Sequence, residues 1–273
     1  MSGVAYRFAV NCSILFTELP VGQRAAAAVA AGFGAVEFWW PWSAPVPSPA
    51  EVSAFVGSVT SAGADLVALN LFGGDLPAGE RGVLAHPGRV QEFRDNLDVV
   101  LEIARRTGCT SFNALYGNRI PGVSPAEQDA VALDNLQHAA RSVADVGGTI
   151  LVEPLSGVPG YPLLTADDAV RVVQQVRSAG HDNVALLYDT FHLAANGEDP
   201  LEVLARYFDV VGHVQVADHP GRHEPGTGDL DLAAVLAGLA ARGWSRSVAL
   251  EYAPSTTTAA AFDWLPRSRR GRP

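Results

Sequence analysis

The amino-acid sequence predicts a single α/β domain built as a (β/α)8 TIM barrel. Eight short apolar runs, typical of buried strands, alternate along the chain with longer amphipathic stretches that are typical of helices. Eight such strand-helix units in 273 residues average about 34 residues each, which suits a barrel of this class. α/β barrels of this length commonly form one domain.

The expected strands follow one another at regular intervals. They are YRFAVNCS (6–13), GAVEFWW (34–40), DLVALNLF (65–72), TSFNALYG (110–117), TILVEPLS (149–156), VALLYDTFH (184–192), VVGHVQVAD (210–218) and VALEYAP (248–254). Between them, residues 88–108 carry apolar side chains at helical spacing. A further helix should start after Ser124 as its cap, with Pro125 in its first position and Glu127 at the capping-box position.

No linker or charge run divides the chain. We therefore expect one catalytic barrel domain over residues 1–265, followed by a basic, disordered tail over residues 266–273. Neither a signal peptide nor an apolar run of membrane-spanning length is present in the sequence, so we expect a cytoplasmic protein without a membrane partner.

Composition excludes several functions. The net charge of -10 argues against a nucleic-acid partner, because affinity for the phosphate backbone depends on basic surface. All 19 basic residues are arginines. The lack of lysine excludes Schiff-base chemistry, lysine-bound pyridoxal phosphate and a Walker-type phosphate loop. The chemistry must therefore come from carboxylates, histidines, arginines or a metal.

Polar side chains recur at the ends of the last four expected strands, at intervals of about one strand-helix unit. They are Glu153, Asp189, Gln215 and Glu251. One such residue alone is more often a helix cap or a salt-bridge partner. In a barrel, however, the strand ends share one mouth, and four oxygen ligands there favour a hard divalent cation. The amide of Gln215, and the lack of a cysteine or histidine pair, favour Mg²⁺ or Mn²⁺ over Zn²⁺.

Several motifs resemble those of the hydroxypyruvate isomerases, within the xylose isomerase-like barrel superfamily, over nearly the whole chain. They include FAVNCSILFTE, GFGAVEFWWPW, AGERGVLAHPGR, LVEPLSG, YDTFH, GHVQVADHPGRHEPGTGDL and EYAPSTTTAAAFDWL. The resemblance implies one divalent cation held by Glu153, Asp189, Gln215 and Glu251, with the two glutamates also acting as acid and base. Related sugar epimerases usually carry histidine where this chain has Gln215, which favours the isomerase branch.

The implied reaction interconverts hydroxypyruvate and tartronate semialdehyde. A base removes the proton beside the ketone, a cis-enediolate forms, and a proton returns to the neighbouring carbon. The cation would act as Lewis acid and template. Three alternatives remain open: isomerisation of 2-oxo-tetronate or 3-epimerisation of a ketose, a metal-dependent phosphoesterase, and a non-catalytic barrel. The phosphoesterase normally needs several histidine ligands and a basic face, and the non-catalytic barrel predicts lost ligands.

Other residues are candidates to contact a small anionic keto acid or sugar-like substrate. Arg222 offers a planar fork for a carboxylate, although a surface contact is an alternative. His192 fits the YDxxH-like pattern of the family and could contact the substrate or the ligands. His213 shares a strand face with Gln215, so it could brace the site from the layer below or be a core histidine.

The loop GGDLPAGERG, residues 73–82, could close over the substrate with Arg81 or Glu80 reaching in, or could be an ordinary solvated loop. Glu37, at the end of the second expected strand, also faces the expected mouth. The sequence leaves a homo-oligomeric assembly open.

Overall fold

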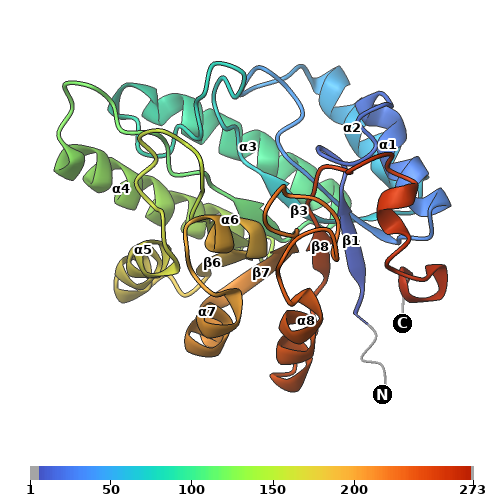
Figure 1. Cartoon of the computed structure of the whole chain (residues 1–273). Helices are drawn as coiled ribbons and strands as arrows, with labels where there is room; N and C mark the ends of the chain where they lie inside the picture. Colours follow the sequence, from blue (N-terminus) through green and yellow to red (C-terminus); the bar gives the residue numbers. More distant parts are fainter. Residues whose placement is uncertain (1–5, 272–273) are drawn as a thin grey trace.

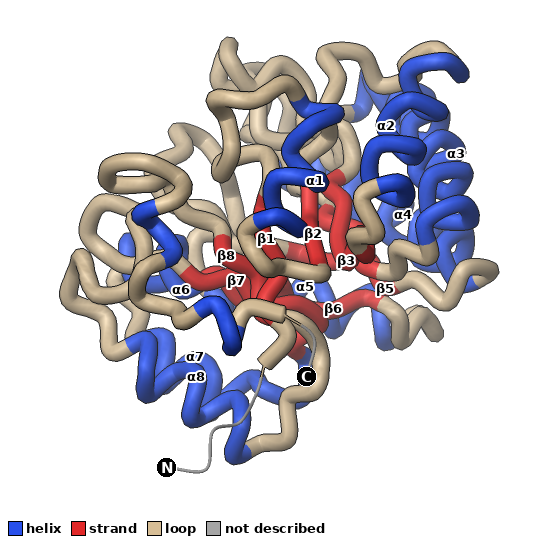
Figure 2. The backbone as a smooth tube through the Cα atoms, turned by 90° about the vertical axis from the view of Figure 1, so that its right-hand side faces the viewer, coloured by secondary structure: helices blue, strands red, loops and turns tan. Residues whose placement is uncertain are grey.

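The strands form a closed parallel barrel in sequence order, with β1 paired to β8, which confirms the predicted (β/α)8 architecture. The structure is a computed structural model that describes residues 6–271. Helices surround the strands on the outside, as Figures 1 and 2 show. No helix within residues 6–271 is both long and apolar enough to cross a bilayer.

The strands are shorter than the apolar runs that predict them, because the chain leaves the ladder at the carboxyl end of each run. They are β1 Phe8–Asn11, β2 Ala35–Phe38, β3 Asp65–Asn70, β4 Ser111–Asn113, β5 Thr149–Val152, β6 Val184–Asp189, β7 Val211–Val216 and β8 Val248–Leu250. The α-helices are α1 Val21–Ala30, α2 Pro49–Ser61, α3 Val90–Thr107, α4 Pro125–Ala144, α5 Ala166–Ser178, α6 Thr190–Ala195, α7 Pro200–Tyr207 and α8 Leu232–Ala241. Short 3-10 turns are η1 Pro87–Arg89, η2 Phe208–Val210, η3 Ala260–Phe262 and η4 Arg267–Arg269.

Local sequence signals explain where the helices begin. The Ser124 side chain accepts a hydrogen bond from the backbone N–H of Glu127, and Pro125 takes the first position of α4, as predicted. Ser48 and Glu51 form a complete capping box at the start of α2. The apolar side chains of α3 lie on one buried face, which packs the helix against the barrel.

Successive side chains along each strand point alternately to two apolar cores, one between the strands and the helices and one inside the barrel. Phe8 and Val10 belong to the large core that the helices cover, whereas Ala9 clusters with Ala35 and Ala249 inside the barrel. Side chains two positions apart share a face of a strand. The next inward positions therefore hold the residues at the barrel mouth: Asn11, Glu37 and Glu251. Leu151 and Leu187, from a second inward cluster, precede Glu153 and Asp189 in the same way.

The carboxyl-terminal segment contacts the rest of the chain over residues 266–271, so the structure gives no support to the predicted disorder there; residues 272–273 lie outside the described residues. Arg267 donates to the backbone oxygen of Ala30 at 2.8 Å, and Arg270 donates to that of Ala31 at 3.2 Å. Arg270 also donates to the carbonyl oxygens of Leu265 and Phe262. Basic side chains thus satisfy carbonyls that the end of α1 leaves open.

We expect Arg270→Ala to lower the free energy of unfolding by about 1–3 kcal/mol, because three carbonyl groups lose their donor. Urea denaturation at neutral pH would measure the change. Arg171→Ala is the control, since that arginine is 66% exposed on α5, and it should change stability by no more than about 0.5 kcal/mol. Equal losses in the two variants would argue against the docking of this segment.

Candidate active site

A cavity of about 240 Å³ opens at the carboxyl ends of the strands and is lined by Glu153, His192, Arg222 and Glu251, among others. Three larger cavities are less informative. One of about 540 Å³ lies outside the barrel beside α8, one of about 350 Å³ lies between α5 and α7, and one of about 340 Å³ lies at the amino-terminal ends of the strands. None of the three is lined by the carboxylates at the barrel mouth, so the candidate site is identified by its chemistry and not by its size.

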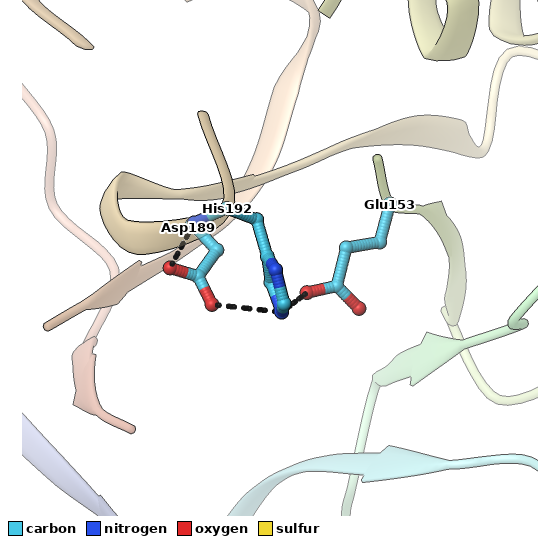
Figure 3. Close-up of side chains that lie close together, drawn as sticks. All are labelled: Glu153, Asp189 and His192. Atoms are coloured by element: carbon cyan, nitrogen blue, oxygen red, sulfur yellow. Dashed lines mark hydrogen bonds and ion pairs between the residues drawn. The ribbon is translucent and has the colours of Figure 1, made fainter. Parts of the chain in front are cut away.

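Glu153, Asp189 and His192 lie together at this mouth (Figure 3). His192 Nε2 is 3.8 Å from Asp189 Oδ2 and 4.0 Å from Glu153 Oε1. Asp189 ends β6 and caps α6, since its Oδ1 accepts from the backbone N–H of Phe191 at 2.8 Å. Its Oδ2 is therefore turned toward the cavity. By their spacing, Glu153, Asp189 and His192 could hold a metal ion.

The hydrogen bonds of His192 define which ring nitrogen carries the proton. Nδ1 accepts from the backbone N–H of Ser156 at 3.0 Å, and the Ser156 hydroxyl lies 2.8 Å from the same atom. Burial lowers the pKa of His192 to about 4, so the ring is neutral at pH 7. A neutral ring that accepts at Nδ1 carries its proton on Nε2. His192 therefore presents an N–H toward Glu153 and Asp189.

Arg222 bridges two of the residues that the sequence predicts as metal ligands. Its Nη2 lies 3.2 Å from Asp189 Oδ2 and 3.1 Å from Glu251 Oε2. The backbone of Arg222 has a φ of 56°, in the left-handed region, and its guanidinium lies 5.3 Å from the centre of the Phe191 ring. A cationic group therefore already interacts with both carboxylates.

Each of the two glutamates has one oxygen held by an asparagine. Asn113 at the end of β4 donates to Glu153 Oε2 at 2.7 Å, and Asn11 at the end of β1 donates to Glu251 Oε1 at 2.9 Å. The indole N–H of Trp39 also donates to Glu251 Oε1. Sequence reasoning did not assign a role to Asn113, although an amide at the end of an expected strand was an available signal.

The two ends of the Gln215 amide have different surroundings. Its Nε2 donates to Glu37 Oε1 at 2.8 Å, whereas its Oε1 is buried and has no hydrogen-bond partner among residues 6–271. Glu37 is 2% exposed and does not line the cavity, and its other oxygen lies 2.6 Å from His213 Nε2. The cavity therefore gives no support to a contact between Glu37 and the substrate, which stays a prediction. His213 contacts Glu37, in keeping with a bracing position.

The loop after β3 contributes Leu76 and Arg81 to the cavity lining. Arg81 donates to the backbone oxygens of Leu76 and Glu80. Glu80 instead forms an ion pair with Arg89, at 2.9 Å, and does not line the cavity. Gly82 has a φ of 109°, and a Cβ there would lie 1.9 Å from the Leu115 carbonyl oxygen. Only glycine therefore fits where this loop passes the backbone of Leu115.

Burial and mutual repulsion raise the pKa values of both glutamates. The pKa of Glu153 rises to about 8, first because the carboxyl is buried and then because Asp189 is close. Burial also raises the pKa of Glu251 well above its usual value, against the opposing effect of Arg222. A carboxyl group with a pKa of about 8, such as that of Glu153, can both accept and donate protons near neutral pH.

The chain belongs to the xylose isomerase-like TIM barrel family, whose model matches residues 25–268. It is 49% identical over 270 residues to a putative hydroxypyruvate isomerase of Streptomyces coelicolor, covering 97% of each chain. It is 33% identical over 264 residues to the hydroxypyruvate isomerase of Escherichia coli, covering 95% of this chain and 98% of that protein.

Further relatives widen the range of named activities. The chain is 34% identical over 261 residues to a 2-oxo-tetronate isomerase of Cupriavidus necator, covering 95% of this chain and 97% of that protein. A crystal structure from Brucella melitensis named as a family 2 AP endonuclease superposes with a TM-score of 0.85 at 33% identity, covering 95% of this chain and 97% of the other. The curated relatives are isomerases, and the protein is an enzyme of that class.

We expect the stability of the chelator-treated protein to fall as the pH rises from about 4.5 to about 8, and then to level off. The folded chain keeps the Glu153 proton up to a pKa of about 8, whereas the unfolded chain loses it near pH 4.3. Urea denaturation across this pH range would measure the slope. Glu153→Gln has no titrating group at this position and should make the slope shallower, while Glu251, whose pKa is also raised, still contributes to it. An unchanged slope in this variant would contradict the raised pKa of Glu153.

Proposed function

We propose that this enzyme interconverts hydroxypyruvate and tartronate semialdehyde with a divalent cation, Mg²⁺ or Mn²⁺. The observation that carries this proposal is the pair Glu153 and Glu251. Both are buried, have raised pKa values and line one small cavity beside Asp189. Two curated relatives that align along nearly their whole length are named for this activity, one of them as putative.

The oxygens of Glu153, Asp189, Gln215 and Glu251 would hold the cation. The support comes from the Gln215 amide oxygen, a buried acceptor without a partner among the described residues, and from Arg222, which shows that these carboxylates already attract positive charge. An all-oxygen set suits Mg²⁺ or Mn²⁺. A bound cation would supply Lewis-acid stabilisation of negative charge on the substrate oxygens.

We assign His192 to the substrate and not to the cation. A histidine ligand needs a free lone pair on the coordinating nitrogen, but Ser156 holds Nδ1 as an acceptor and leaves the proton on Nε2. The Nε2–H group can donate to a substrate oxygen between Glu153 and Asp189. This contact would orient the substrate and favour negative charge on that oxygen in the enediolate.

The two glutamates would carry the proton between adjacent carbons. One carboxylate removes a proton from C3 of hydroxypyruvate, which gives the cis-enediolate, and a protonated carboxyl delivers a proton to C2. The hydroxyl proton passes from the C3 oxygen to the C2 oxygen, so the product is the isomeric hydroxy aldehyde. Asn113 and Asn11, each donating to one glutamate, keep these two carboxyl groups in place.

Arg222 would bind the substrate carboxylate, with Arg81 at the side of the cavity. The Nε of Arg222 is buried and has no partner among the described residues, so the guanidinium keeps a donor for a substrate oxygen. Cation binding would compete with Arg222 Nη2 for Asp189 and Glu251, because both carry positive charge. A bound cation would then take over the contacts with Asp189 and Glu251, and the guanidinium of Arg222 would bind the substrate carboxylate instead.

2-Oxo-tetronate is the second candidate substrate, since a relative with similar identity is named for its isomerisation. It shares the carboxylate and the carbonyl that the same residues would bind. A ketose 3-epimerase lacks comparable support, because it would leave Arg222 without a carboxylate. A phosphoesterase normally uses several histidine ligands, and the metal-type cluster among residues 6–271 contains one histidine. The cytoplasmic location and a homo-oligomeric assembly stay predictions.

The first expected result is cation-dependent conversion of hydroxypyruvate, followed by proton NMR in D2O. Glu153→Gln and Glu251→Gln should each lower kcat by at least about a hundredfold, because each removes an acid-base group. Glu198→Gln, an isosteric change at a partly buried site by α7, is the control and should retain activity. Unchanged hydroxypyruvate at high concentrations of cation-loaded enzyme would refute the substrate; conversion of 2-oxo-tetronate under those conditions would establish the second candidate.

A second expected result separates carboxylate binding from catalysis. Arg222→Met should lower kcat/KM for hydroxypyruvate by about tenfold to a hundredfold, as the loss of a charged hydrogen bond predicts. Dihydroxyacetone, which presents the same hydroxyketone without a carboxylate, should be converted slowly by both proteins and lose little in the variant. A similar loss for both compounds would show that Arg222 supports the site and does not select the acid.

A further inference from the structure

Glu37 is a buried carboxylate that the proposed reaction leaves without a role. It follows Ala35 on the inward face of β2, is 2% exposed and does not line the cavity. Its Oε1 accepts from Gln215 Nε2 at 2.8 Å and from Asn11 Nδ2 at 2.9 Å, and its Oε2 lies 2.6 Å from His213 Nε2. A carboxylate in such a position is costly unless its partners satisfy it.

The contact with Glu37 decides which end of the Gln215 amide faces which way. The oxygen and the NH2 group of an amide are nearly equal in size, and the last torsion of glutamine is soft, so packing alone does not choose between the two orientations. A carboxylate accepts hydrogen bonds and does not donate them. Glu37 therefore holds the NH2 group of Gln215 and turns the amide oxygen away from itself.

We propose that Glu37 is a positioning residue that sets the orientation of the Gln215 amide, and thereby presents an oxygen and not an NH2 group to the cation. This inference rests on the cation site of the proposed function. The unpartnered, buried state of Gln215 Oε1 supports it, because an acceptor that meets no donor in the described protein is available to a cation.

The same carboxylate reaches the second glutamate through Asn11. The Oδ1 of Asn11 accepts from the backbone N–H of Ser13 at 2.9 Å, which fixes the asparagine with its NH2 group inward. That NH2 group donates to both Glu37 and Glu251, each at 2.9 Å. Glu37 thus orients Gln215 directly and Glu251 through one intermediate residue.

The test is Glu37→Gln, which keeps shape but allows position 37 to donate as well as accept. The Gln215 amide can then turn, and its NH2 group would repel the cation. We expect the Kd for Mn²⁺, measured by isothermal titration calorimetry on chelator-treated protein, to rise about tenfold to a hundredfold. The Kd of Glu198→Gln, the same exchange away from the site, should remain at the wild-type value.

The double variant E37Q/Q215E tests orientation specifically, because it exchanges the carboxylate and the amide between the two positions. Both ends of a carboxylate at position 215 are oxygens, and the amide at position 37 can donate to one of them. We expect this variant to bind Mn²⁺ at least as tightly as the wild type, whereas Q215E alone sets two carboxylates against each other and should unfold at a lower temperature. A structural role alone would lower the Tm of Glu37→Gln and leave its Kd unchanged, and this result would overturn the proposal.

A readout without metal separates this inference from the proposed function. The side-chain amide signal of Gln215, assigned by its loss in Q215E, should show slow hydrogen exchange in ¹H–¹⁵N spectra of the wild type and faster exchange in Glu37→Gln. Equal exchange in the two proteins would overturn the orienting role. A wild type that binds no Mn²⁺ would refute the cation site, and with it the proposal that the Gln215 amide is oriented for a cation. If Mn²⁺ binds as expected but hydroxypyruvate is not converted, only the proposed substrate is refuted.

Discussion

The two-residue period of the barrel strands is the constraint on which the site depends. Once the eight strands close into a ring, every second side chain must point inward, and the last inward position of each strand lies at the mouth. Small residues such as Ala35 and Ala249 fill the layer below, which leaves the polar residues Glu37 and Glu251 as the next inward positions. A slip of one residue in a strand would move its carboxylate into the apolar layer under the helices.

Concentrating four carboxylates in one buried region is electrostatically unfavourable, and the structure compensates in three ways. Amide groups of Asn11, Asn113 and Gln215 donate to carboxylate oxygens. The guanidinium of Arg222 joins Asp189 and Glu251. The remaining repulsion and the loss of hydration appear as raised pKa values of the glutamates, which retain protons that exposed carboxyls would lose. The excess of buried negative charge lowers stability, and it also makes the barrel mouth suited to binding a cation and to proton transfer.

The side chains of the site fall into two groups. Glu37 and His213 contact each other and do not line the cavity, whereas Arg81, His192 and Arg222 line it together with Glu153 and Glu251. Under the proposed function, this arrangement separates positioning from contact with the substrate.

The sequence by itself determined the architecture and the four polar strand ends, because periodic apolar runs and the interval between units are local properties that repeat. It was less able to determine contacts. Glu37 looked like a substrate residue because its place at a strand end is visible, whereas its engagement by Gln215 and His213 arises only when β2 and β7 face each other across the barrel. The arginine-rich tail looked disordered because its composition is polar. Only the tertiary structure supplied the open carbonyls at the end of α1 that its arginines satisfy, and such partners, distant in sequence, leave no local pattern.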